Sequence, residues 1–117
     1  MADVLGIRRP VLTRLRFIEA MLVRHRFVNR RLLTGVFGLQ TAMASKDLAL
    51  YASLNPTVHM NYHTKNWEPE AEFVPLAGLL HMPAADYLVA IGKVFDVEFG
   101  MVTLKTEFGV LKTRGGK

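Results

Sequence analysis

A short turn at Gly38, between two helical patterns, is the sequence feature that most constrains the fold. Asn29 is placed to cap a helix over residues 30–37, RRLLTGVF, because its side chain can accept a hydrogen bond from the first turn. Glycine reaches a left-handed backbone conformation at little steric cost, so Gly38 ends this helix and opens a three-residue turn. Thr41 then caps a helix over about 42–53. Two helices joined so closely cross at a steep angle.

The apolar residues of both helices recur at the helical period, which separates a buried side from an outer side. In the first helix the inward residues are Leu32, Leu33, Val36 and Phe37. In the second they are Ala44, Leu48 and Tyr51. The outer side of the second helix then carries Thr41, Ala42, Met43, Ser45, Lys46 and Ala49. The side chains of this outer side are short enough for the helix to approach the major groove of DNA without steric obstruction.

A further helix precedes the pair. After Pro10, Thr13 is placed to cap a helix in which Leu15, Ile18 and Leu22 follow the helical period.

A hairpin is predicted after the pair. Val58, Met60 and Tyr62 alternate with polar residues, and a HTKN link leads to Trp67. The acidic EPEAE stretch that follows is predicted to be an exposed linker.

The C-terminal part predicts one more helix and a strand-like end. The helix extends from Pro83 or Ala84 to Phe95, and its apolar stripe is Tyr87, Leu88, Ile91, Val94 and Phe95. The segment VEFGMVTLKTEFGVLK, residues 97–112, alternates well enough to form one or two strands, with a short helix as the alternative.

This order of elements predicts a winged helix-turn-helix, a mainly α fold with a small β-hairpin wing, of the α+β class. We assign residues 1–73 to a winged helix-turn-helix DNA-binding domain. Residues 74–117 are predicted to be a dimerisation segment of the same compact unit, because 117 residues are about one domain's worth of chain.

Charge is unevenly distributed along the chain. Fifteen Lys and Arg against ten Asp and Glu give a net charge of +5 and a pI near 9.9, which favours a polyanionic partner. Residues 1–31 hold eight arginines against Asp3 and Glu19, whereas residues 67–101 hold six acidic residues against Lys93. The first segment predicts a surface for phosphates, and the second a surface turned away from DNA and available to a second subunit.

The predicted partner is therefore double-stranded DNA. The amino end of the helix near residue 41 offers N–H groups to a phosphate, and a side chain such as Lys46 can donate to guanine O6 and N7. The expected contacts on this helix and its turn are Gln40, Thr41, Ala42, Met43, Ser45 and Lys46. Lys65 and Asn66 are expected to contact DNA from the hairpin tip. The expected phosphate contacts from the arginine-rich region are Arg14, Arg16, Arg30 and Arg31.

The sequence also resembles a known family in LRFIE of the first helix, VNR before the second, FG followed by AS-x-DL-xx-Y, and the lysine and aromatic of the hairpin. These residues are similar to the winged-helix N-terminal domain of WYL-type transcriptional repressors from bacterial anti-phage defence islands. The resemblance covers about 60 of 117 residues. It implies a homodimeric repressor in which Thr41, Ser45 and Lys46 occupy the DNA-reading positions. Because the family's ligand-sensing WYL domain is absent from this sequence, we expect a stand-alone relative from a phage or mobile element, with no small-molecule ligand.

Other classes of function have less support. The chain lacks cysteine, and no acidic residue joins His59 and His63 at ligand spacing, so neither a metal nor another cofactor is predicted. Motifs of phosphate-binding loops and nucleophile elbows are missing, so no enzymatic activity is expected. We find neither a signal peptide nor an apolar run long enough for a membrane, and we expect a cytoplasmic, nucleoid-associated protein of a bacterial cell.

The resulting hypothesis is a homodimeric, sequence-specific repressor that reads a pseudo-palindromic operator with recognition helices about 34 Å apart. The alternative is a protein-binding adaptor or anti-repressor with the same fold. RNA binding is a weaker alternative, because the strands lack the paired aromatic residues of single-strand platforms.

Overall fold

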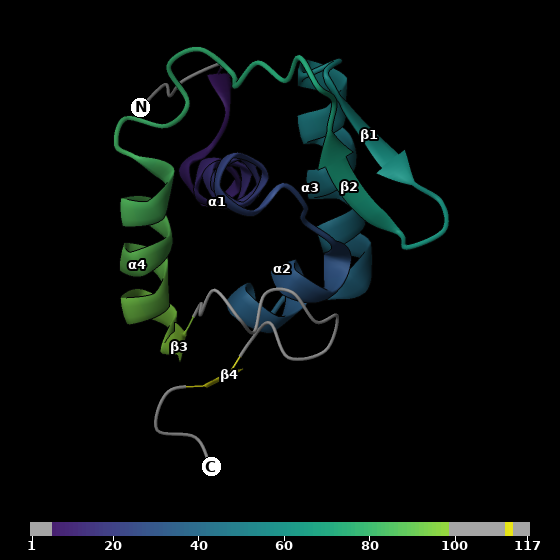
Figure 1. Ribbon diagram of the computed structural model, residues 1–117. Helices are drawn as coiled ribbons and strands as arrows, with labels where there is room; N and C mark the ends of the chain where they lie inside the picture. The colour runs from purple at the N-terminus through teal and green to yellow at the C-terminus, as the bar shows by residue number, and fades with distance from the viewer. Residues whose placement is uncertain (1–5, 99–111, 114–117) are drawn as a thin grey trace.

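The computed structural model describes residues 6–98 and 112–113, and its first helix lies at the centre of the fold (Figure 1). This helix, α1 (Arg9–His25), packs against α3 (Thr41–Leu54) on one side and α4 (Ala84–Phe95) on the other. The short helix α2 (Arg30–Phe37) packs against α3. The three longer helices therefore form a row with α1 in the middle.

The start of α1 differs from the prediction. The helix begins at Arg9, with Pro10 in its first turn, where the missing N–H of proline costs nothing. Thr13 therefore lies inside the helix, and its hydroxyl donates to the carbonyl oxygen of Arg9 at 3.1 Å instead of capping the end. The prediction that Thr13 is the cap was wrong because proline alone is sufficient to start the first turn.

The helix-turn-helix forms as its local sequence requires. Asn29 caps α2 by accepting a hydrogen bond from the N–H of Leu32 at 2.9 Å. Gly38 ends α2 with φ of 69°, in the left-handed region, and its N–H donates to Thr34. The start of α3 was predicted one residue too late. Gln40 is the N-cap residue, with no side-chain capping bond, and Thr41 is already the first helical residue.

The wing is an antiparallel hairpin of β1 (Val58–Asn61) and β2 (Asn66–Pro69). A bridge between Val28 and Trp67 joins this hairpin to the connection between α1 and α2. The first residues of the EPEAE stretch belong to β2, so the predicted linker is shorter than expected. Tyr62 does not continue the strand alternation: it lies in the hairpin loop and is 77% exposed.

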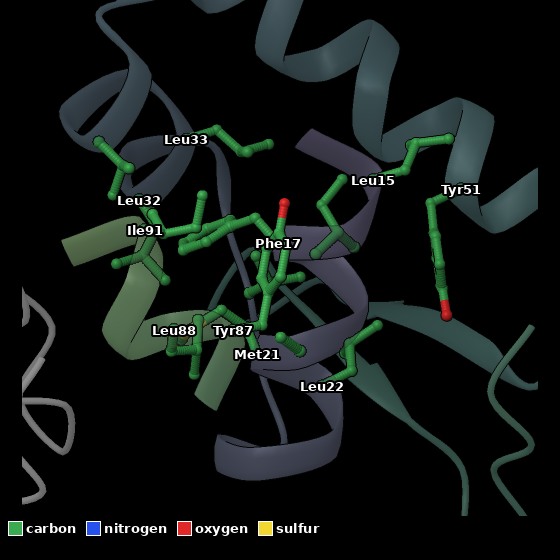
Figure 2. Packing of buried hydrophobic residues seen from close by; sticks show 14 of the residues in the cluster. Leu15, Phe17, Met21, Leu22, Leu32, Leu33, Tyr51, Tyr87, Leu88 and Ile91 are labelled. Atoms are coloured by element: carbon green, nitrogen blue, oxygen red, sulfur yellow. The ribbon is translucent and has the colours of Figure 1, made fainter. Parts of the chain in front are cut away.

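The core lies around α1 and is shown in Figure 2, where side chains of α2, α3 and α4 converge on this helix. The predicted inner residues of α3 are buried: Ala44, Leu48 and Tyr51. Phe37 of α2 makes edge-on ring contacts with Phe17 of α1 and with Phe95 of α4. On α4 the predicted stripe is buried except at its end, where Phe95 is 37% exposed and Val94 is 72% exposed. Val94 of the predicted apolar stripe therefore lies outside the core of the described chain.

Two short strands follow α4, and β3 (Val97–Glu98) pairs antiparallel with β4 (Lys112–Thr113). At Val97, Glu98 and Lys112 the strand prediction is confirmed over the helical alternative, and Thr113 lies just beyond the predicted segment. The rest of the predicted C-terminal strands, residues 99–111, lies outside the described residues. The assignment of residues 74–117 to dimerisation stays a prediction. No helix of the described part of the chain has the length and apolarity needed to cross a membrane.

Candidate nucleic-acid interface

The outer side of α3 is open along its length. Thr41, Ala42, Met43 and Lys46 are exposed, and Ser45 is half-buried. These are the residues that the helical period separates from the buried side of α3. The helix therefore presents a continuous outer surface in which Lys46 is the cationic side chain.

The amino end of α3 is also accessible. The carbonyl oxygen of Gln40 accepts from the N–H groups of Met43 and Ala44, both at 3.1 Å, while the Gln40 side chain is exposed and makes no capping bond. A helix terminus of this kind carries partial positive charge. It therefore adds a favourable electrostatic contribution at the end of the helix where Thr41 and Gln40 lie.

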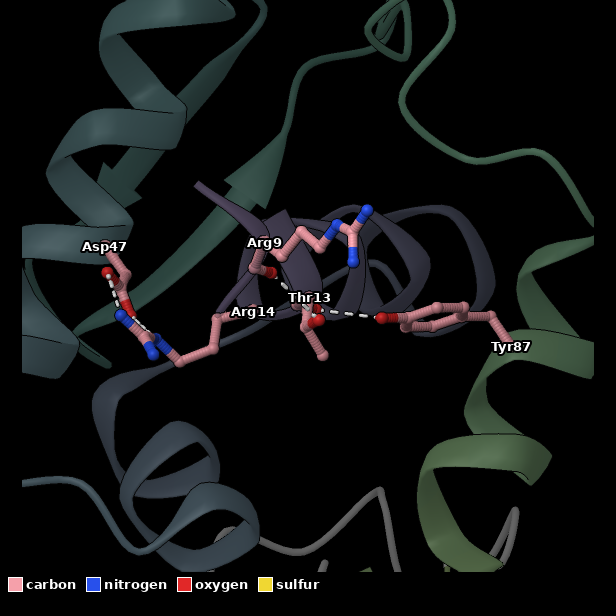
Figure 3. A network of polar contacts seen from close by, with 5 residues as sticks. All are labelled: Arg9, Thr13, Arg14, Asp47 and Tyr87. Atoms are coloured by element: carbon pink, nitrogen blue, oxygen red, sulfur yellow. Dashed lines mark hydrogen bonds and ion pairs between the residues drawn. The ribbon is translucent and has the colours of Figure 1, made fainter. Parts of the chain in front are cut away.

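Asp47, the acidic residue of α3, is turned away from this outer side (Figure 3). Its carboxylate accepts from Arg14 of α1, with 2.5 Å between Nε and Oδ2. Asp47 is 3% exposed, and the Arg14 side chain is 12% exposed. The pair joins α1 to α3 and removes a negative charge from the outer surface. Arg14 is thus placed to hold and neutralise Asp47, and its predicted contact with phosphate is not supported by this position.

The other predicted arginines fall into two groups. Arg16 is half-buried and donates to the carbonyl oxygen of Leu79, 2.8 Å away, so it holds the segment before α4 and not an open surface. Arg30 and Arg31 are exposed at the start of α2. Arg30 donates to the hydroxyl of Ser45 at 3.4 Å, which brings its guanidinium beside the outer side of α3.

The hairpin contributes a cationic tip. Lys65 is exposed and adopts a left-handed backbone with φ of 67°, and its ammonium lies 5.9 Å from the centroid of the Tyr62 ring. Asn66, in contrast, accepts from the side-chain amide of Asn29 at 2.9 Å, so its oxygen joins the wing to the cap of α2. Tyr62 is a further exposed residue of this tip, which the strand alternation did not predict. The residue that could have predicted this position is Asn61. Its side chain accepts from the N–H groups of His63 and Thr64 in the loop, and so ends the strand before Tyr62.

A buried polar cluster fixes the other end of α3. The carboxyl of Glu19, which is 1% exposed, accepts from the Tyr51 hydroxyl at 2.6 Å and from the N–H of Leu76 at 2.7 Å. The amide of Asn55 donates to Tyr51 and to the carbonyl oxygen of Val74. Burial raises the pKa of Glu19, and the hydrogen bonds from Tyr51 and Leu76 act against this rise. Sequence patterns gave no sign that these residues would meet.

Histidines and carboxylates do not form a metal site in the described part of the chain, where no group of three potential ligands gathers. His59 lies 3.8 Å from a carboxylate oxygen of Glu70, and both side chains are about half exposed.

A protein family described as the BrxR transcriptional regulator winged helix-turn-helix domain matches residues 10–92. A comparison with curated proteins finds no match. The matched residues include the helix-turn-helix and the hairpin and reach into α4. The predicted fold class is thereby confirmed, as is the resemblance to the winged-helix domain of a transcriptional regulator. Because the match covers well over half of the chain, this protein belongs to the family of BrxR transcriptional regulator winged helix-turn-helix domains.

Proposed function

We propose that the protein is a sequence-specific repressor that binds double-stranded DNA as a homodimer on a pseudo-palindromic operator, with α3 in the major groove. The observation that carries this proposal is the exposed outer side of α3. This side carries no acidic side chain, because Asp47 is buried and pairs with Arg14. A helix so exposed, with a cation and no outward acid, suits the negative potential of DNA.

The side chains on this surface can distinguish bases. Lys46 donates to guanine O6 and N7, and Ser45 donates or accepts. Ala42 and Met43 provide apolar contact for a thymine methyl group. Thr41 and Gln40, at the amino end of the helix, are placed to bond a phosphate or a base edge.

Cations at both margins of α3 are proposed to contact phosphates. Arg30 and Arg31 lie at the start of α2, and Lys65 lies at the hairpin tip with Tyr62 beside it. Arg14 and Arg16 are left out of this interface, because each already holds a partner within the fold.

Lys46→Ala tests the proposal directly. Duplexes are first selected from a random pool on the wild-type protein, and binding is then measured by fluorescence anisotropy on the selected duplex and on a scrambled one. We expect Lys46→Ala to weaken binding to the selected duplex by roughly tenfold or more, and binding to the scrambled duplex by much less. Arg8→Ala is the matched control, because it removes one positive charge from an exposed residue that lies outside both α3 and α4 and whose side chain caps no helix.

Two outcomes contradict parts of the proposal. Equal losses on both duplexes would make Lys46 a phosphate contact only. Failure of the wild type to bind any duplex at low salt would refute DNA binding and favour the protein-binding adaptor.

A further inference from the structure

The side of α4 that faces away from α1 has an unusual arrangement of exposed residues. It carries apolar side chains around two opposite charges. The exposed residues are Ala85, Asp86, Val89, Ala90, Lys93 and Val94. Val89 is 58% exposed and Val94 is 72% exposed, and burying such side chains is favourable.

The two charges are placed symmetrically along the helix. Asp86 and Lys93 are equally far from the midpoint between Val89 and Ala90, and their spacing of seven residues puts both on one line along α4. Neither side chain forms a hydrogen bond or an ion pair with another described residue. A surface of this kind is complementary to itself when two copies meet antiparallel.

We infer that this side of α4 is the surface through which a second copy of the chain binds. In an antiparallel pair about a twofold axis at the helix midpoint, Asp86 lies opposite Lys93 of the partner subunit, and this contact occurs twice. Val89 and the small Ala90 lie next to the axis, where they bury apolar surface and permit close approach. The inference rests on the homodimer of the proposed function and names its surface.

The placement of α4 leaves the proposed DNA surface accessible. Figure 1 shows α4 on the opposite side of α1 from α3, so α4 pairing does not cover α3 or the hairpin. Five successive helix packings of about 8–10 Å separate the two α3 axes by about 40–50 Å when the helices lie in a row. We therefore expect half-sites more widely spaced than the single turn of about 34 Å expected from the sequence.

The surface is small, which determines how the experiment is run. One side of a 12-residue helix buries less than the roughly 1,200–2,000 Å² of stable interfaces. We therefore expect a weak dimer, with a dissociation constant on the order of micromolar or above.

Charge exchange tests the inference by sedimentation equilibrium of the full chain. Asp86→Lys and Lys93→Asp each place like charges opposite each other twice, so each is expected to weaken the dimer by about tenfold. The double variant restores opposite charges and is expected to return to within about threefold of wild type. Glu72→Lys, the same change at an exposed residue outside α4, is the matched control and leaves the dimer unchanged.

The double variant also separates association from folding. Asp86 is in the first turn of α4 and Lys93 in the last, so both exchanges oppose the helix dipole. If the single exchanges weakened the dimer by destabilising α4, the double variant would dimerise more weakly than either single variant. Recovery in the double variant therefore supports the interface, whereas its failure to recover overturns it.

Three further results distinguish this inference from the proposed function. A wild type that stays monomeric at millimolar concentration overturns the α4 surface, whatever its DNA affinity. Monomeric α4 variants that bind a duplex with one half-site as the wild type does support both proposals. A wild type that dimerises through α4 but binds no duplex refutes the proposed function and leaves the α4 surface intact.

Discussion

The two sides of α1 hold their neighbouring helices by different means. Towards α3, the contacts include a buried ion pair, Arg14 with Asp47, and a buried carboxyl, Glu19, that accepts from Tyr51. Towards α4, apolar packing is supplemented by the Tyr87 hydroxyl, which donates to the carbonyl oxygen of Thr13 at 2.9 Å (Figure 3). Directional, charged contacts fix orientation more strictly than apolar packing does. We therefore expect the orientation of α3, the helix proposed to read DNA, to be fixed more strictly than that of α4.

The largest effect is expected at the ion pair. Asp47→Ala leaves the guanidinium of Arg14, whose side chain is only 12% exposed, without its carboxylate, and we expect a loss of about 3 kcal/mol in the free energy of unfolding. Urea denaturation measures this loss, and Glu72→Ala, at an exposed carboxylate outside the helices, serves as control with a change within about 0.5 kcal/mol. The double change Arg14→Met with Asp47→Leu should cost less than Asp47→Ala. Similar losses for Asp47→Ala and the control would show that the pair does not hold α3.

An intermediate effect is expected from removing one hydroxyl on each side of α1. Tyr51→Phe removes a donor to a buried carboxyl and is expected to cost about 2 kcal/mol, whereas Tyr87→Phe removes a neutral bond and is expected to cost about 1 kcal/mol. Burial raises the pKa of Tyr87 to about 12, so this hydroxyl stays protonated at the neutral pH of the urea titration. The two variants are matched in chemistry. The reverse order of losses would contradict the difference between the two sides.

The smallest effect is expected from Glu19→Gln, which keeps an oxygen to accept from Tyr51 and Leu76 but removes the charge. Burial raises the folded-state pKa of Glu19 above the ordinary value of 4.5, so its stabilising contribution is complete below pH 4.5 and is lost as pH rises through the folded-state pKa. Glu19→Gln has no titrating group at this position and so lacks this loss of stability as pH rises. Its stability relative to wild type should therefore increase from pH 4.5 upward, as measured by urea titrations at successive pH values. A difference independent of pH would show that Glu19 titrates normally.

Local chemistry made much of the fold predictable. The Asn29 cap, the Gly38 turn and the α4 helix each depend on residues within a few positions of one another. The helical period of α3 also separated its outer residues from Ala44, Leu48 and Tyr51 correctly. The errors at Thr13 and Thr41 are of the same local kind, since several neighbouring residues can start a helix.

The roles of individual polar residues were not predictable in this way. Arg14 meets Asp47 across 33 residues of sequence, and Arg16 meets Leu79 across 63. Asn66 meets Asn29 across 37. In the sequence these side chains are indistinguishable from Arg30 or Lys65, which remain exposed. The helical period therefore predicted the exposed side of α3, but it gave no sign that Arg14, Arg16 and Asn66 have partners within the fold. Contact of any of these residues with DNA stays a prediction.

By itself the sequence determined the order of helices, the glycine turn and the outer side of α3, because caps, left-handed residues and apolar periods act over one or two turns. Only the tertiary structure decided which charged side chains remain exposed and which are paired with another residue inside the fold. It turned Asp47 and Arg14 towards each other, and it left Asp86 and Lys93 of α4 unpaired among the described residues. The physical reason is that a charge is neutralised by its neighbours in space, and packing around α1 decides which residues become neighbours.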